Sequence, residues 1–455
     1  MITYSNYSAS SCDWIDKIPS DWRAQRIKSL LGLRDERNYK PLNEVNLISL
    51  YTGLGVRQHK DIEHTTGNKA RNADGYKVVY PDDIVVNILL CWMGAIGRSA
   101  YYGVTSPAYD IYRPKTLEVN TQYYNYLMRT PMFAQQCYRA GKGIMAMRWR
   151  TYSPQFSNIV VPVPPREEQD QIVRFLDWKV SSINKLINIR KRQIEELEEL
   201  KRSSIGQLVM GQAQSLPQKG TAISWVKTIP DHWDEKSLIQ VAEEQQIKNT
   251  GMIEDNLLSL SYGKIINKDI NTTDGLLPAS FEGYQIVHDG NVILRLTDLQ
   301  NDHKSLRTGL ATQTGIITSA YTCLKARHNV LPEYLQLQLH VADLCKVFYG
   351  MGGGVRQSIG FKEIRKLIVA IPPIDEQEHI LACVHDIEKP INCAIQKNRD
   401  IIAELEDLKV RLISDAVTGK IDVSGIEIPE YEFMEESADA DAEDDGEEAT
   451  GEQED

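Results

Sequence analysis

The chain has 455 residues, of which 42% are hydrophobic, so it is long enough to bury two or more ordinary cores. No apolar run approaches the roughly 18 residues of a membrane span. The N-terminal stretch lacks the basic start and apolar run of a secretory signal, so we expect neither feature. Seven scattered cysteines without a CxxC pair predict reduced thiols and a cytoplasmic protein, not disulfides or a zinc site.

The formal net charge of −12 is unevenly distributed. Residues from Ile426 onward contain 15 Asp and Glu and no Lys or Arg, which leaves 51 Lys and Arg against 48 Asp and Glu in the rest of the chain. A slightly basic body is compatible with a nucleic-acid partner. Residues 423–455 have little to bury, so we expect a disordered acidic tail that solubilises the chain or, alternatively, serves a regulatory or partner-docking role.

Residues 1–160 are predicted to form a first head of mixed helix and strand. They open with the motif W-x3-I-P-x2-W, from Trp14 to Trp22. Short apolar, β-branched and Tyr-rich runs follow, separated by Gly, Asn and Asp clusters, which is typical of many short strands. The two tryptophans are interpreted as core or docking anchors and not as ligand contacts.

Residues 161–213 are predicted to form a long spacer helix. Pro164-Pro165 cannot lie inside a helix or at the centre of a strand, so this pair marks a boundary. The apolar residues after it step by threes and fours, which predicts one narrow seam as in a coiled coil. Gly211 ends the pattern, where glycine best takes the left-handed conformation. The seam residues are Leu176, Val180, Ile183, Ile187, Ile194 and Leu197.

Residues 214–368 and 369–422 repeat this organisation as a second head and a second spacer helix. Val161–Gln212 aligns without a gap with Val369–Lys420 at an offset of 208, and 18 of the 52 positions are identical. The matching seams predict that the two helices pair with each other, with Arg190 and Asn398 at corresponding positions. Pro390 lacks a backbone N–H, so we expect it to bend or break the second helix.

Motifs for catalysis are missing from the chain. It contains no GxxxxGK[ST] phosphate loop, no HExxH, no GxSxG and no Asn/Asp-Pro-Pro-Tyr/Phe tetrapeptide of an amino-methyltransferase. Nine dispersed histidines lack metal-ligand spacing, so no metal site is predicted. Outside the acidic tail, the polar residues that could bind a ligand lie in segments at glycine turns of both heads. These segments mix basic, amide and aromatic residues.

Such mixtures suit contacts with DNA, because Arg and Lys reach phosphates and guanine edges while Asn and Gln suit adenine edges. Any one of these residues is more often an ordinary surface charge, but their recurrence in two heads favours a function. The candidates in the first head are Arg57, Gln58, Lys60, Arg71, Asn72, Arg98, Lys142, Arg148 and Arg150, and those in the second head are Lys264, Arg295, Lys304, Arg307, Arg356 and Gln357.

These features together resemble the specificity (S) subunits of type I restriction-modification enzymes. The resemblance covers the chain up to about Asp422 and rests on the two IPxxW openings, the two PP-x2-EQ stretches, and the long helices that end in Gly211 and Gly419. The PP-x2-EQ stretches run from Pro164 to Gln169 and from Pro372 to Gln377.

The resemblance implies an α+β fold: two globular target recognition domains separated by two long antiparallel coiled-coil helices, related by an internal pseudo-two-fold repeat. It implies that each head reads part of a double-stranded DNA site and that the helices dock two methyltransferase (M) subunits, to which restriction (R) subunits add. S-adenosylmethionine, ATP and Mg would belong to those partners. The chain itself would be non-catalytic and would carry no cofactor.

Two rival functions remain open. One is a single-chain nuclease or methyltransferase whose motifs are not recognisable, and the other is a coiled-coil adaptor that binds proteins without DNA specificity. Methylation or cleavage by the purified chain alone would favour the first. DNA binding that is insensitive to salt and to sequence would favour the second.

Overall fold

The computed structural model divides the chain into two compact units. Unit 1 comprises Met1–Arg192 and Asn398–Asp455, and unit 2 comprises Gln193–Lys397, so the division falls inside both long helices. We call the part of unit 1 before the first long helix head 1, and the part of unit 2 between the two long helices head 2. The structure describes residues 3–61, 72–143, 149–212, 216–261, 263–270, 280–300, 306–351 and 358–435.

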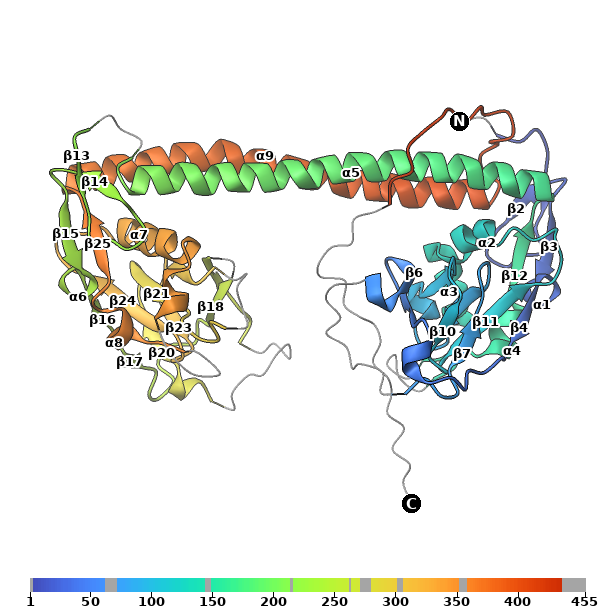
Figure 1. Ribbon diagram of the computed structural model, residues 1–455, viewed down its shortest axis with the longest axis horizontal. Helices are drawn as coiled ribbons and strands as arrows, with labels where there is room; N and C mark the ends of the chain where they lie inside the picture. Colours follow the sequence, from blue (N-terminus) through green and yellow to red (C-terminus); the bar gives the residue numbers. More distant parts are fainter. Residues whose placement is uncertain are drawn as a thin grey trace, which may run out of the picture. The chain divides into compact units, whose positions relative to one another are not determined.

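Head 1 consists of short antiparallel strands with small helices packed on them (Figure 1). Its largest sheet has four strands in the order β4 (Leu31–Arg34), β11 (Tyr109–Pro114), β8 (Ile84–Asn87) and β9 (Ile96–Arg98). Four strand pairs complete it: β1 (Tyr7–Ala9) with β2 (Lys17–Pro19), β3 (Arg23–Arg26) with β12 (Val160–Val163), β5 (Ile48–Tyr51) with β6 (Gly55–Gln58), and β7 (Lys77–Val79) with β10 (Gly103–Thr105). The helices are α1 (Ile27–Leu30), α2 (Thr121–Met128), α3 (Pro131–Ala140) and α4 (Ser153–Asn158), with 3-10 turns η1 (Leu42–Glu44), η2 (His59–Asp61) and η3 (Cys91–Met93).

Head 2 repeats this strand arrangement. Its four-stranded sheet has the order β16 (Ala242–Glu244), β24 (Thr322–Ala326), β21 (Asn291–Leu294) and β22 (Thr308–Leu310). The smaller sheets are β13 (Gln218–Gly220) with β14 (Thr228–Pro230), β15 (Asp234–Ser237) with β25 (Ile368–Ile371), β18 (Leu258–Ser261) with β19 (Lys264–Asn267), and β17 (Ile247–Lys248), β20 (Gln285–Val287) and β23 (Gly315–Ile317) together. The helices are α6 (Leu238–Val241), α7 (Pro332–Leu344) and α8 (Phe361–Ile364), with 3-10 turns η5 (Phe281–Gly283) and η6 (Val347–Gly350). The predicted α+β class and the internal repeat are confirmed.

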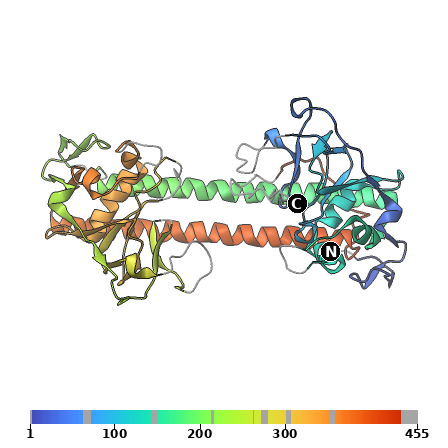
Figure 2. The same ribbon diagram turned by 90° about the horizontal axis from the view of Figure 1, so that it is seen from below.

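The two predicted spacer helices are α5 (Arg166–Val209) and α9 (Ile374–Val417), each 44 residues long. In each unit they lie side by side and run antiparallel (Figures 1 and 2). In unit 1, Leu176, Ile183 and Ile187 are buried in one cluster with Leu412 and Ala416. In unit 2, the buried Ile205 and Val209 of α5 share a cluster with Ile380 and Val384 of α9. The predicted seam is therefore confirmed at Leu176, Ile183 and Ile187, and Ile205 and Val209 extend the packing beyond the predicted set.

Arg190 and Asn398 lie opposite each other in the helix pair of unit 1. The Nη1 atom of Arg190 donates to Oδ1 of Asn398 at 3.4 Å, and the two residues are 208 positions apart, which is the offset of the repeat. Arg190 therefore contacts its own counterpart in the other copy of the repeat.

Of the two effects expected of Pro390, a bend or a break of the second helix, the break was wrong, because α9 is continuous from Ile374 to Val417 with Pro390 inside it. Pro390 and Asp386, whose carbonyl would ordinarily accept from residue 390, are both exposed. Water can therefore satisfy the carbonyl that proline leaves without its helical donor. Because Pro390 faces solvent, the missing hydrogen bond does not interrupt α9.

The glutamine of each PP-x2-EQ stretch fastens a head to a long helix. Gln169 is 1% exposed; its Oε1 accepts from the backbone N–H of Asn120 at 2.9 Å, and its Nε2 donates to the carbonyls of Glu118 and Pro164 at 3.1 and 2.9 Å. Asn120 is the N-cap of α2, so these three hydrogen bonds, which we call the glutamine bracket, position that helix.

Gln377 repeats the bracket in unit 2. It is fully buried; its Oε1 accepts from the N–H of Leu331 at 2.9 Å, and its Nε2 donates to the carbonyls of Asn329 and Pro372 at 3.0 and 2.9 Å. Leu331 is the N-cap of α7. The motif that carries the family resemblance therefore has a structural role within each unit.

A buried tyrosine makes a second repeated contact between head and helix. The hydroxyl of Tyr123 in α2 donates to the carbonyl of Val417 at 2.8 Å, and that of Tyr334 in α7 donates to the carbonyl of Val209 at 3.1 Å. Burial raises the pKa of both tyrosines well above its ordinary value, so they remain protonated donors. Each tyrosine satisfies one of the carbonyls that a helix C-terminus leaves unpaired.

Both long helices end two residues before the glycine that the sequence predicts as the stop, at Val209 before Gly211 and at Val417 before Gly419. Gly211 and Gly419 have φ values of +65° and +73°, and a Cβ on either would collide with the proline ring of an IPxxW motif, Pro230 or Pro19. Trp233 and Trp22 of the same motifs are 2% and 4% exposed and contact these ends. The prediction that these tryptophans are packing anchors is confirmed.

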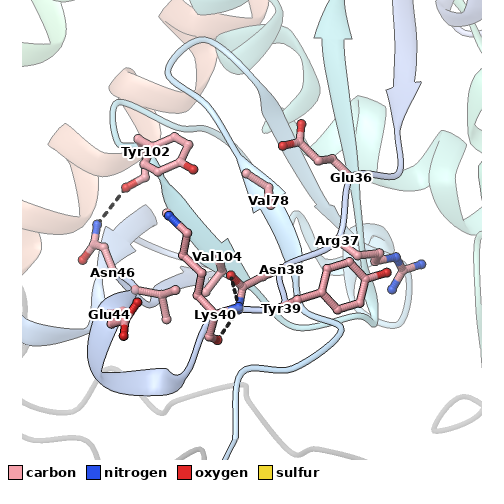
Figure 3. A pocket seen from close by; sticks show the side chains of 12 residues that line it. Glu36, Arg37, Asn38, Tyr39, Lys40, Glu44, Asn46, Val78, Tyr102 and Val104 are labelled. Carbon is pink, nitrogen blue, oxygen red and sulfur yellow. Dashed lines mark hydrogen bonds between the residues drawn. The ribbon is translucent and has the colours of Figure 1, made fainter.

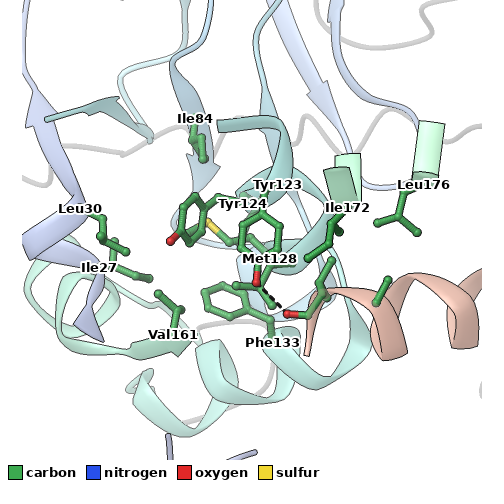
Figure 4. Packing of buried hydrophobic residues seen from close by; sticks show 14 of the residues in the cluster. Ile27, Leu30, Ile84, Tyr123, Tyr124, Met128, Phe133, Val161, Ile172 and Leu176 are labelled. Carbon is green, nitrogen blue, oxygen red and sulfur yellow. Dashed lines mark hydrogen bonds between the residues drawn. The ribbon is translucent and has the colours of Figure 1, made fainter. Parts of the chain in front are cut away.

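The core of unit 1 joins head 1 to both long helices. Figure 4 shows Ile27, Val161 and Phe133 of head 1 gathered near Tyr123, with Ile172 of α5 at the edge of the same cluster. Val417 and Ile421, at and beyond the end of α9, belong to the same buried cluster. Head 1 and its portions of α5 and α9 therefore form one packed body.

Residues 423–435 follow a defined path along α5, in contrast to the expected disorder of residues 423–455. Ile426 and Ile428 pack against the core of unit 1, and Nε2 of Gln171 donates to the carbonyls of Val423 and Ile426 at 3.0 and 2.8 Å. These apolar and hydrogen-bonded contacts hold the first part of the predicted tail. Residues 436–455 lie outside the described residues.

Candidate nucleic-acid interface

The hairpin β5–β6 carries the first group of predicted DNA contacts in head 1. Arg57 stands opposite Ser49 across the hairpin, with Gln58 after it and the exposed Lys60 in the following turn. The guanidinium of Arg57 is paired with the carboxylate of Glu435, with Nη2 to Oε2 at 3.0 Å. Its side chain is 27% exposed, so part of Arg57 still reaches solvent.

Arg129, which the sequence did not single out, positions this hairpin. It is the C-cap of α2, and its Nη2 donates to the carbonyls of Thr52 and Gly53 in the hairpin turn. Because α2 is itself fixed to α5 through Asn120 and Gln169, the hairpin is linked to the long helix by a chain of hydrogen bonds. No local sequence pattern marks Arg129, since its partners are backbone atoms far along the chain.

Arg98 lies on β9, a strand that packs beside β6. Its Nε donates to Oδ1 of Asp82 at 2.8 Å, and its backbone N–H donates to Oδ1 of Asn125 in α2 at 2.9 Å. The neighbouring carboxylate offsets part of the positive charge of Arg98, and its assignment as a DNA contact stays a prediction.

Lys142 and Arg150 are brought together by a short antiparallel bridge. The N–H of Lys142 donates to the carbonyl of Arg150 at 2.9 Å, and the N–H of Arg150 donates to the carbonyl of Lys142 at 3.0 Å. The ring of Trp149 stacks on Tyr138 with 4.8 Å between centroids. Thr151 then ties the segment to the end of β8 through Ile88, at 3.0 Å. The bridge between these two basic residues lies near Ile88, just beyond one end of β8, whereas Arg98 pairs with Ile84 at the other end of that strand.

Asn72 is exposed and accepts from the backbone N–H of Asp74 at 3.0 Å, which makes it a turn residue. The following residue, Ala73, contacts Asn38, which lines a cavity of about 440 Å³ (Figure 3). The charged residues in its lining are Glu36, Arg37, Lys40 and Glu44. Their charges balance, so the cavity lacks the net positive charge that a phosphate backbone attracts.

In head 2, Lys264 and Arg295 are accessible but lie on different elements. Lys264 begins β19 and is exposed, facing Ser261 across the hairpin. Arg295 follows β21, and its N–H donates to the carbonyl of Arg307 at 2.8 Å. The structure does not bring these two candidates into one cluster by any contact among the described residues.

The assignment of Arg307 as a DNA contact was wrong, because this residue is 0% exposed. Its Nη1 donates to the carbonyls of Arg295 and Thr297 at 3.2 and 2.8 Å, and its Nε donates to the hydroxyl of Tyr349 at 3.0 Å. A planar guanidinium with five donors suits this inward role, since it satisfies several backbone carbonyls of one loop at once. The residue organises the loop after β21 from inside the head.

Five predicted contacts lie outside the described residues, and their assignment stays a prediction: Arg71, Arg148, Lys304, Arg356 and Gln357. Within the described ranges, no group of three or more His, Cys, Asp or Glu residues is arranged to hold a metal ion. Among the helices of the same ranges, none combines the length and the apolar composition needed to cross a bilayer.

Comparison with known proteins extends over nearly the whole chain. No protein-family model matches it. It is 22% identical over 444 residues to the putative type I restriction enzyme MjaX specificity subunit of Methanocaldococcus jannaschii, covering 90% of this chain and 96% of that protein. It is 24% identical over 238 residues to the MjaVIII specificity subunit of the same organism, covering 51% and 52% of the two chains. The resemblance to type I specificity subunits is confirmed.

A solved structure supports the fold. The chain superimposes with a TM-score of 0.61 and 14% identity on a chain from a study of complex assembly and conformational transition of the type I R-M system, covering 89% of this chain and 99% of that one. This likeness shows that the α+β heads and the two long helices form a fold known among solved type I structures.

Proposed function

We propose that this chain is the DNA sequence-specificity subunit of a type I restriction-modification complex. Its two heads read the two halves of a bipartite site in double-stranded DNA. One observation carries the proposal: buried contacts at Gln169 and Gln377 hold both heads on the long helices in the same way, while exposed side chains at matching positions differ. A common frame with two unlike surfaces suits the reading of two unlike half-sites.

The hairpins of the two heads illustrate the difference. In head 1, Ser49 faces Arg57, and in head 2 the matching Ser259 faces Ile266, which is 41% exposed. Arginine donates to phosphates and guanine edges, whereas an exposed isoleucine can contact only apolar groups such as the thymine methyl. The target is therefore asymmetric, with a gap between its halves. A symmetric site would need only one kind of head.

The paired helices α5 and α9 set the length of that gap and provide docking surfaces for two methyltransferase subunits, to which restriction subunits add. S-adenosylmethionine, ATP and Mg belong to these partners, and this chain is non-catalytic and acts in the cytoplasm. Support comes from the full-length likeness to a specificity subunit, with 96% of that protein covered, and from the absence of recognisable catalytic motifs in the sequence.

The proposal is tested by co-expressing the chain with a type I methyltransferase subunit and mapping methylated adenines in the host genome. We expect one methylated motif made of two different half-sites separated by a fixed gap. Two results would instead favour a protein adaptor without DNA specificity. One is methylation at adenines that share no motif, and the other is a stable complex that methylates no adenine. Methylation or cleavage by the purified chain alone would establish an enzyme.

The spacing role has its own test. Inserting one heptad into each helix at corresponding positions, after Arg190 and after Asn398, adds about 10 Å of helix, or roughly three base pairs of DNA. The mapped gap should lengthen by that amount while both half-sites stay the same. A single insertion in α5 alone is the matched control, since it breaks the register of the pair and should abolish methylation. An unchanged gap in the chain with both insertions would refute the proposal that the helices set the gap.

A further inference from the structure

The end of the described chain is seated on α5 by side-chain hydrogen bonds. We call residues 426–435 the strap. The hydroxyl of Ser181 donates to the carbonyl of Glu432 at 3.0 Å and accepts from the N–H of Met434 at 2.7 Å. Asn184 and Asn188 donate to the carbonyls of Met434 and Glu435 at 3.3 and 3.4 Å. Residues 181, 184 and 188 are spaced by three and four, so one face of the helix presents a row of polar groups to the strap.

The row is only partly repeated in α9. At the repeat offset of 208, Ser181, Asn184 and Asn188 correspond to Lys389, Asn392 and Gln396 of α9. The two asparagines share one contact, since Asn392 accepts from the ammonium of Lys201 at 3.1 Å and Asn184 accepts from that of Lys409 at 3.4 Å. Asn184 in addition donates to the strap. The segment that follows Gly211 in unit 2 enters β13 of head 2, whereas the segment that follows Gly419 becomes the strap. The strap is thus a feature of one unit and has no role in the repeated frame.

The strap ends at a predicted DNA contact. The Oε2 atom of Glu435 lies 3.0 Å from Nη2 of Arg57, and the side chains of the pair are 60% and 27% exposed. Arginine binds phosphate and the guanine edge with the same N–H donors that it offers to a carboxylate. Glu435 therefore occupies a donor that DNA would need in head 1.

The sequence surrounding this contact is strongly acidic. The strap contains four Glu and no Lys or Arg, and residues 436–455 add eleven Asp and Glu, again without a basic residue. A polyanion tethered next to a binding surface acts at a high effective concentration, of the order of millimolar for short flexible links. Its charge mimics that of a phosphate backbone, and its effect weakens with salt.

We propose that the strap is a built-in competitor of DNA at head 1. Glu435 holds Arg57 until DNA displaces it. DNA that offers only phosphates is opposed by the tethered acid, while a true half-site adds base contacts and wins. The device sharpens discrimination in one head and not in the other. This inference rests on the proposed function, because it assumes that Arg57 meets DNA.

The test uses the full-length chain in its methyltransferase complex, with three variants: Glu435→Gln, Glu430→Gln, and a chain in which the eleven acidic residues after Glu435 are changed to Asn and Gln. Binding to a duplex lacking the methylated motif and to one containing it is measured from low to high salt. Glu435→Gln should tighten binding to the non-specific duplex about two- to five-fold at low salt. Binding to the specific duplex should change less.

Glu430→Gln is the matched control, since it removes one charge from the same strap five residues before the contact, and its effect should be smaller. In an Arg57→Ala background, Glu435→Gln should have no effect. The variant neutralised after Glu435 should show the largest gain, which disappears at high salt. Equal affinities of the parent and all variants at every salt concentration would overturn the inference.

The outcomes separate the two hypotheses. If the parent complex binds its motif selectively but no strap variant alters DNA binding, the competitor is refuted and the proposed function stands. If the parent shows no preference for any sequence, the proposed function fails, and the competitor fails with it. Tightening by Glu435→Gln that persists without Arg57 would also refute the competitor, because the effect would not pass through this ion pair.

Discussion

The two heads differ least where they touch the long helices and most where they face outward. Gln169 and Gln377 make the same three hydrogen bonds, and Tyr123 and Tyr334 reach corresponding carbonyls. On the matching hairpins, by contrast, an arginine in one head is replaced by Ile266 in the other. The buried contacts therefore define a common platform, on which the exposed residues are free to change.

The interiors of the heads also differ, at the residue just before β9 in head 1 and just before β22 in head 2. The backbone N–H of Asn87 donates to the carbonyl of Ala95 in head 1, and the backbone N–H of Arg295 donates to the carbonyl of Arg307 in head 2. Both Ala95 and Arg307 are fully buried. The segment between the paired strands is longer in head 2, where the Arg307 guanidinium donates to the carbonyls of Arg295 and Thr297, whereas Ala95 in head 1 carries only a methyl group.

Arg307→Ala is expected to have the largest effect. It removes the donors to the carbonyls of Arg295 and Thr297, and the loss should destabilise head 2 by about 3–5 kcal/mol. Arg307→Lys should rescue little, because an ammonium cannot reproduce the planar fork. Hydrogen exchange should show faster opening in unit 2 and no change in unit 1. A stable Arg307→Ala chain with only a shallower salt dependence of DNA binding would show instead that Arg307 contacts DNA.

Gln169→Ala and Gln377→Ala should each cost about 2–3 kcal/mol, since each leaves buried carbonyls and an N–H without partners. The comparison predicts similar losses, each confined to its own unit when hydrogen exchange is measured. A large loss for one substitution and none for the other would show that the brackets are not equivalent despite their matching geometry.

Gly211→Ala and Gly419→Ala should each lower stability by about 1–2 kcal/mol, because φ is positive and the new Cβ meets a proline ring. Gly206→Ala is the control within α5. A Cβ there meets no described atom within 4 Å, so the change should stabilise the helix by about 0.5–1 kcal/mol. Thermal unfolding of the three variants checks both signs. Destabilisation by Gly206→Ala would contradict this account of the helix ends.

Arg57→Ala should have the smallest effect, with no loss of fold and a loss of about 1 kcal/mol in binding at one half-site if the side chain touches a base. Ile266→Ala in head 2 is the matched substitution and should affect only the other half-site. Methylated-motif mapping distinguishes the two halves. An equal loss on every sequence for Arg57→Ala would indicate a phosphate contact.

Sequence patterns predicted the elements whose signals are local. The Pro-Pro boundaries, the spacing of the apolar seam and the terminal glycines Gly211 and Gly419 all depend on neighbours along one helix. Arg129 was missed because its partners are the carbonyls of Thr52 and Gly53, far along the chain. Arg307 was misread because composition does not reveal that its side chain points inward to the carbonyls of Arg295 and Thr297. Pro390 was misjudged because its effect depends on which side of α9 faces solvent. The strap escaped notice because acidic composition concealed Ile426 and Ile428, which pack on the core.

The central claim is that a common frame carries two heads that read different half-sites. It is tested most directly by replacing head 2 with a second copy of head 1, joined at the same frame contacts, and mapping the methylated motif. We expect an inverted repeat of one parental half-site with an unchanged gap, because the two antiparallel helices are copies of one repeat. A folded, assembled chain that still methylates the asymmetric parental motif would contradict it.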